Sequence, residues 1–99
     1  MTESQLRDQI CDYLRKKGML IFRDNQQTGR HFRGVNFRES KGRADILGCI
    51  KPTGRFLAIE VKVKGNVPSP EQVQFLDDVA RAGGIAFLAY SLNDVMERI

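Results

Sequence analysis

The fold of this 99-residue chain is decided by one stretch, residues 42–64, which reads GRADILGCIKPTGRFLAIEVKVK. Two apolar runs flank a Pro-Thr-Gly turn, a pattern typical of a β-hairpin. A two-residue loop and a four-residue loop both give the same strand register. In that register Asp45 is predicted to lie directly opposite Glu60, so the hairpin brings two carboxylates together.

The surroundings of this pair indicate a site. Side chains alternate between the two faces of a strand, which places Asp45, Glu60 and Lys62 on one face. Both faces are otherwise largely apolar, so we expect the hairpin to be covered on both sides. Like charges directly opposite each other, with Cβ atoms about 5 Å apart, destabilise a sheet unless something lies between them.

A divalent cation between Asp45 and Glu60 removes that repulsion, and oxygen ligands suit Mg²⁺ or Mn²⁺ rather than Zn²⁺. The ammonium of Lys62 can hold a water or a phosphate oxygen beside it. The alternative is an ordinary hairpin with charged ends, and a slipped register would remove the opposition.

The composition favours one compact domain over residues 1–99 with a polyanionic partner. Net charge is +4 and the isoelectric point about 9.4. No apolar run reaches membrane-spanning length and no signal-peptide pattern is present, so we expect a cytoplasmic protein without membrane contact. Cys11 and Cys49 are predicted to be reduced and buried, and the lone His31 lacks partners for a zinc site.

The N-terminal residues predict a helix over residues 3–17, opened by a capping box from Thr2 to Gln5 and followed by a strand over residues 19–23. Two interpretations of Glu3 stand. Its carboxylate points inward toward the site, or it only complements the positive end of the helix dipole.

Residues 24–43 lose apolar periodicity and interleave basic residues with aromatic ones. Such a segment can grip phosphates and stack on bases, although a solvated loop with an edge strand near residues 35–38 is the alternative. The candidate nucleic-acid contacts are Arg30, His31, Arg33, Arg38, Lys41 and Arg43.

The remainder predicts a second helix, a buried parallel strand and a short final helix. Ser69 is the expected N-cap, with Pro70 at the first helical position and Gln72 closing a second capping box. Gln72 is also within reach of the carboxylate site. The inner face of this helix is predicted to comprise Val73, Leu76, Val79 and Ala80. The strand, over residues 85–90, should run parallel to the one that carries Glu60.

The order α-β-β-β-α-β, with helices on both sides of a mixed sheet, predicts an α/β fold. Asp45, the Glu60-Val61-Lys62 triplet, the Ser-Pro-Glu-Gln helix start and the Gly83-Gly84 pair together resemble the PD-(D/E)XK nuclease superfamily. Within it, the chain is similar to the small stand-alone form of the VRR-NUC (virus-type replication-repair nuclease) family that is typical of phages. One departure is Ala44, where a proline usually precedes the aspartate.

The resemblance implies metal-dependent endonuclease cleavage of DNA phosphodiester bonds, and for the small members a behaviour like that of Holliday junction resolvases. It implies that Asp45, Glu60 and the Val61 carbonyl bind Mg²⁺ or Mn²⁺. Lys62 then activates the attacking water, while Glu3 and Gln72 assist. A chain with one site needs a homodimer to cut a four-way junction symmetrically. The alternatives are a general or restriction-like DNA nuclease, a non-catalytic nucleic-acid-binding module, and a plain structural domain.

Overall fold

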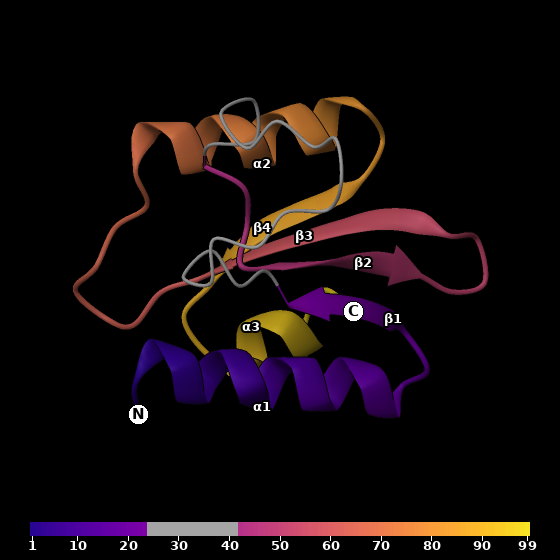
Figure 1. Ribbon diagram of the computed structural model, residues 1–99, viewed down its shortest axis with the longest axis horizontal. Coiled ribbons are helices and arrows are strands. Elements are labelled where there is room, and N and C mark those ends of the chain that lie inside the picture. Colours follow the sequence, from indigo (N-terminus) through magenta and orange to yellow (C-terminus); the bar gives the residue numbers. More distant parts are fainter. Residues whose placement is uncertain (24–41) are drawn as a thin grey trace, which may run out of the picture.

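The computed structural model describes residues 1–23 and 42–99, and Figure 1 shows a twisted sheet between two layers of helices. The elements in chain order are α1 (Glu3–Lys16), β1 (Leu20–Arg23), β2 (Ile46–Ile50), β3 (Arg55–Val61), α2 (Pro70–Arg81), β4 (Ile85–Ala89) and α3 (Leu92–Met96). The predicted α/β fold, a mixed sheet flanked by helices with a short C-terminal helix, is thus confirmed. The proposed edge strand near residues 35–38 lies outside the described residues.

The sheet has the strand order β1-β2-β3-β4. β2 is antiparallel to both β1 and β3, whereas β4 runs parallel to β3, as predicted. In the hairpin Ile50 pairs with Arg55 and Ile46 pairs with Ile59, which is the predicted register. The parallel pairing makes the carboxyl ends of β3 and β4 meet at one edge of the sheet.

Each face of the sheet has its own apolar core. On one face α1 and α3 pack on the sheet through Leu6, Ile10 and Val95, which join Ile59 and Phe87 in one buried cluster. On the other face α2 covers the sheet, as Figure 1 shows from the side. Burial on both faces explains why the hairpin strands are almost continuously apolar.

The second core is smaller and corrects one expectation about α2. Val79 and Ala58 are buried there, with Phe75 and Leu76 packed against them. The predicted inner-face residues Val73 and Ala80 are instead exposed, Val73 to 51%. The helix is rotated so that residues 72, 75, 76 and 79 share the buried side, which turns Gln72 toward the sheet.

Both long helices begin with the predicted capping boxes. Thr2 and Gln5 exchange side-chain and backbone hydrogen bonds at the start of α1, and Ser69 and Gln72 do the same at the start of α2. Gln72 also donates from its side chain to Glu60 of β3, which holds the start of α2 beside this strand. Within the described residues, no helix is long and apolar enough to span a membrane.

Candidate metal and catalytic site

Asp45 is held at the point where the chain enters the sheet. It lies in a bend directly before β2, and its Oδ2 accepts a hydrogen bond of 2.9 Å from the backbone N–H of Val61. The last backbone pair of the hairpin is Ile46 with Ile59, so the Asp45 side chain extends the pairing beyond the end of the ladder. Within a strand the N–H and C=O of one residue point to the same side, so the Val61 carbonyl also faces Asp45.

The approach to Asp45 depends on a glycine. Gly42 has a positive φ of 84°, and a Cβ placed on it would overlap with the backbone carbonyl of Glu71 in the first turn of α2. Only glycine accommodates both the backbone angle and the close approach. The chain segment that leads into Asp45 therefore packs closely against α2.

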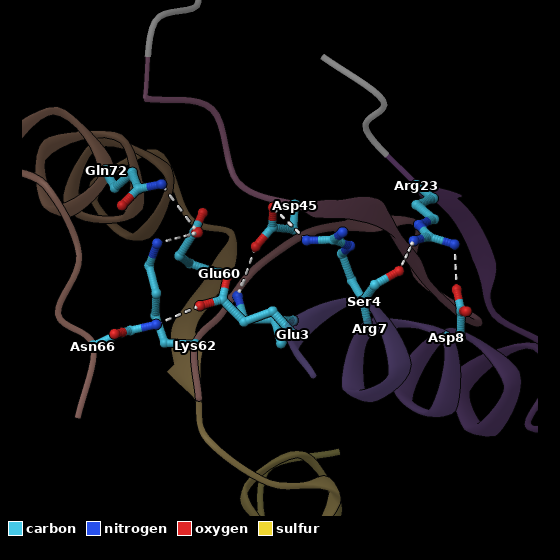
Figure 2. A network of polar contacts seen from close by, with 11 residues as sticks. Glu3, Ser4, Arg7, Asp8, Arg23, Asp45, Glu60, Lys62, Asn66 and Gln72 are labelled. Atoms are coloured by element: carbon cyan, nitrogen blue, oxygen red, sulfur yellow. Dashed lines mark hydrogen bonds and ion pairs between the residues drawn. The ribbon is translucent and has the colours of Figure 1, made fainter. Parts of the chain in front are cut away.

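Glu60 is the only acidic or basic side chain of an Asp, Glu, Lys or Arg that is fully buried in the described part of the chain, with 1% of its surface exposed. Its Oε2 accepts a hydrogen bond of 3.0 Å from Nε2 of Gln72 and lies 3.5 Å from Nζ of Lys62. Figure 2 shows these side chains and Asp45 converging from β3, the start of α2 and the start of β2. The predicted residues Asp45, Glu60, Lys62 and Gln72 are brought together at one edge of the sheet.

The surroundings of Glu60 shift the pKa of its carboxyl group strongly. The pKa of Glu60 rises from 4.5 to about 8, first because burial disfavours its charged form. The nearby Asp45 carboxyl raises this pKa further, because its like charge disfavours a second carboxylate beside it, whereas Lys62 lowers the pKa. A buried carboxyl group that is costly to ionise favours a cation as its partner.

The donor set fits a hard divalent ion. Oε1 of Glu60 is buried and has no hydrogen-bond partner in the described structure, so it is an oxygen available for a ligand. Asp45 supplies a second carboxylate and Val61 a backbone carbonyl, and all three are oxygen donors of the kind that Mg²⁺ and Mn²⁺ prefer. In residues 1–23 and 42–99 no cluster of three His, Cys, Asp or Glu residues could hold a metal, so a cation here needs main-chain or water ligands in addition.

Glu3 lies at the start of α1, near the site but engaged elsewhere. Its Oε2 accepts a hydrogen bond of 2.9 Å from Nδ2 of Asn66, in the loop that connects β3 with α2. The backbone carbonyl of Asn66 also accepts a hydrogen bond of 3.0 Å from the Tyr90 hydroxyl. Glu3 therefore braces the loop that follows Lys62.

Sequence reasoning missed Arg7, which lies one helical turn after Glu3 on α1. Its Nη1 lies 3.4 Å from Oδ1 of Asp45. The spacing of four residues between Glu3 and Arg7 predicts a shared helix face, but the partner of Arg7 is 38 positions away in the chain.

Of the candidate nucleic-acid contacts, only Arg43 belongs to the described residues. It is partly buried and lies two positions before Asp45. The other candidates lie outside the described residues: Arg30, His31, Arg33, Arg38 and Lys41.

A mixed sheet that carries an aspartate, a Glu-x-Lys triplet and a glutamine at one edge has the core arrangement of PD-(D/E)XK nucleases. A family model described as the VRR-NUC domain matches residues 2–93, and the chain belongs to this family. The comparisons with curated proteins and with solved structures give no match.

Membership of this family has direct consequences for function. VRR-NUC domains are nucleases of the PD-(D/E)XK type, so the chain is a hydrolase with DNA as its substrate. Nucleases of this type generally use divalent metal ions, which agrees with the oxygen donors described above.

Proposed function

We propose that this chain is a Mg²⁺- or Mn²⁺-dependent DNA endonuclease that cuts four-way junctions selectively and acts as a homodimer. The observation that supports this most strongly is the buried Glu60, which shares one site with Asp45, Lys62 and Gln72 and keeps one carboxylate oxygen free. A structural hairpin has no need of such an arrangement.

In this proposal Asp45, Glu60 and the Val61 carbonyl hold the cation. A bound divalent ion supplies Lewis-acid chemistry by neutralising charge on the phosphate and acidifying water. Lys62, whose ammonium is 3.5 Å from Glu60 Oε2, orients the attacking water and stabilises the charge that develops on the phosphate oxygens.

Two further residues support these groups. Gln72 donates to Glu60 Oε2, which leaves Oε1 as the oxygen that can turn toward the cation. Glu3 acts indirectly, because its carboxylate holds Asn66 and thereby the loop after Lys62. This brace between α1 and the loop agrees with the second interpretation of Glu3, since Glu3 is also the acidic residue in the first turn of α1.

Selectivity for DNA structure rather than sequence follows from the kind of contacts that this chain can make with DNA. Residues 2–93 match the nuclease domain, so these residues contact DNA through the domain that cuts it. The contacts we assign to DNA are basic side chains that bind phosphates: Arg30, Arg33, Arg38, Lys41 and Arg43, with His31 beside them. Such contacts respond to the path of the backbone.

The homodimer follows from symmetry. Resolution of a four-way junction requires two cuts related by a twofold axis, whereas one chain carries one candidate site. Two copies related by the same axis meet this requirement.

Cleavage of a four-way junction and of a linear duplex with the same arm sequences, both with Mn²⁺, tests the proposal. We expect paired cuts in the junction at least about tenfold faster than in the duplex, none with Asp45→Asn, and a dimer in analytical ultracentrifugation. Equal rates on both substrates would favour a general or restriction-like nuclease. Binding without cleavage would favour a non-catalytic nucleic-acid-binding module.

A further inference from the structure

Arg7 holds an unusual place for an arginine on an amphipathic helix. Its side chain is only 21% exposed, and its guanidinium reaches from α1 to the Asp45 carboxylate, itself 23% exposed (Figure 2). The ion pair of Lys16 with Asp12 on the surface of the same helix is much more open, with 79% and 71% of the side chains exposed, whereas the Lys62–Glu60 pair of the candidate site is more buried still. A charge pair with this little solvent is less screened than one on an open helix surface.

The contact with Arg7 completes the fixation of Asp45. Oδ2 accepts the Val61 N–H at 2.9 Å, and Oδ1 lies 3.4 Å from Arg7 Nη1. If Asp45 had only the hydrogen bond from Val61, its carboxylate could rotate about that bond. The two contacts together set the plane of the carboxylate, because β3 holds one oxygen and α1 the other.

The contact also leaves the carboxylate able to bind a cation. At 3.4 Å it is longer than a tight charge-assisted hydrogen bond, and a carboxylate oxygen has two lone-pair sites. Oδ1 can therefore accept from Arg7 and keep a site for a metal ion. The guanidinium is planar and carries its donors in a rigid fork, so it can orient its partner.

This position leaves Arg7 with an unsatisfied donor. Its Nε is buried and has no hydrogen-bond partner in the described residues. Buried polar groups are nearly always hydrogen-bonded, so the unpaired Nε of Arg7 needs an explanation. A function of its guanidinium at Asp45 provides one.

We propose that Arg7 is a positioning residue, which holds the Asp45 carboxylate in the orientation that binds the divalent cation. This inference deepens the proposed function and rests on it for the identity of the ligand. Partners that orient metal ligands typically contribute about 10- to 100-fold in metal affinity or activity.

The test compares Arg7→Gln, Arg7→Lys and a matched control, Arg15→Gln, in the same helix. The Arg15 guanidinium donates to the backbone carbonyl of Ile21, away from the site. Isothermal titration of each protein with Mn²⁺ in the absence of DNA reads the cation site directly, with Asp45→Asn as the baseline. Urea unfolding of each variant checks the fold.

We expect Arg7→Gln to bind Mn²⁺ about tenfold more weakly, Arg7→Lys to recover part of the affinity, and Arg15→Gln to match the wild type. In cleavage assays Arg7→Gln should lower kcat about tenfold and require more Mn²⁺ for half-maximal rate, while KM for DNA changes less than about twofold. A guanidinium that only stabilises the fold would not move the Mn²⁺ requirement. If Arg7→Gln fails to fold, Arg7→Lys decides by the same titration.

Unchanged or tighter Mn²⁺ binding in a folded Arg7 variant would overturn the inference. A rise in KM for DNA with an unchanged Mn²⁺ requirement would also overturn it, because Arg7 would then act on the substrate. Wild-type protein that binds Mn²⁺ but cuts no DNA would refute the proposed function alone, and the titration would still judge Arg7.

Discussion

The Asp45 side chain accepts the backbone N–H of Val61 at 2.9 Å, in the place where a backbone carbonyl of β2 would continue the ladder. This bond ties the first carboxylate of the candidate site to the residue that follows the second one, Glu60. The Asp45 carboxylate is thereby fixed relative to the backbone of β3, while the Glu60 carboxyl group is held by Gln72 and Lys62. A site built in this way needs little reorganisation when a cation binds.

Asp45→Asn and Lys62→Ala should each abolish cleavage while the fold and DNA binding persist. Asparagine keeps an oxygen that can accept the Val61 N–H but removes the charge that a cation needs. We expect a loss of at least about 100-fold in single-turnover rate with Mn²⁺ for either change. DNA binding, measured with Ca²⁺ in place of Mn²⁺, should change less than about threefold. A Lys62→Ala protein that cuts at the wild-type rate would refute the role assigned to Lys62.

The two capping boxes offer a matched pair for Gln72. Gln72→Glu and Gln5→Glu both preserve the capping box, because glutamate serves as well as glutamine at that position. Gln72→Glu, however, replaces the amide that donates to Glu60 Oε2 with another carboxylate. We expect the cleavage rate to fall at least about tenfold for Gln72→Glu and to stay unchanged for Gln5→Glu. Equal effects of the two changes would mean that Gln72 is only a cap.

The raised pKa of Glu60 predicts how the stability of the metal-free protein depends on pH. Its pKa is about 8 in the folded state against an ordinary value of 4.5. Below pH 4.5 the Glu60 carboxyl group is protonated in the folded and in the unfolded protein, so its contribution to the free energy of unfolding is fully present. Between the two values the unfolded chain loses this proton and the folded chain keeps it, so the free energy of unfolding decreases as pH rises through about 8.

Urea unfolding in EDTA at about pH 5.5 and about pH 9 measures this decrease. Glu60→Gln resembles the protonated carboxyl group, so this variant should lose much less stability than the wild type over the same range. It should also lose the increase in thermal midpoint that Mn²⁺ gives the wild type. If the two proteins respond equally to pH, the titrating group is not Glu60.

Gly42→Ala should destabilise the protein more than Gly54→Ala does. Both glycines have positive φ, of 84° and 78°, so both substitutions carry the backbone strain of roughly 1 kcal/mol or more. Only at Gly42 does the new Cβ meet the Glu71 backbone, whereas at Gly54 nothing lies within 4 Å. We expect an additional cost of about 1–3 kcal/mol for Gly42→Ala in chemical denaturation. Equal costs would show that α2 can move away from Gly42.

Substitution of Arg30, Arg33 or Arg38 by glutamine should weaken DNA binding rather than chemistry. Removal of one phosphate-binding charge should reduce the slope of log K against log salt by roughly 0.9. Fluorescence anisotropy at several salt concentrations measures that slope, with Arg81→Gln as a control, since Arg81 pairs with Asp77 on the outer side of α2. A slope that is the same as in the wild type would assign these arginines to another partner.

The sequence by itself determined the local framework of this protein. The turn at Pro52 and Thr53 fixes the hairpin register. The capping boxes fix the helix starts through Thr2, Gln5, Ser69 and Gln72. Glu60 and Lys62 are two positions apart, which predicts that they share one face of the strand. These features depend on periodicity and on hydrogen bonds between residues three or four positions apart, which can be recognised without knowing the rest of the fold.

Only the tertiary structure decided which helix faces meet the sheet. Apolar residues of α2 lie at positions 73, 75, 76, 79 and 80, so periodicity alone does not determine how the helix is rotated about its axis. In the structure Phe75 packs against the sheet and Val73 is exposed. The contact of Arg7 with Asp45 and that of Glu3 with Asn66 join residues 38 and 63 positions apart. Such contacts depend on where α1 is placed over the sheet, and this placement results from burying both faces of the hairpin at once.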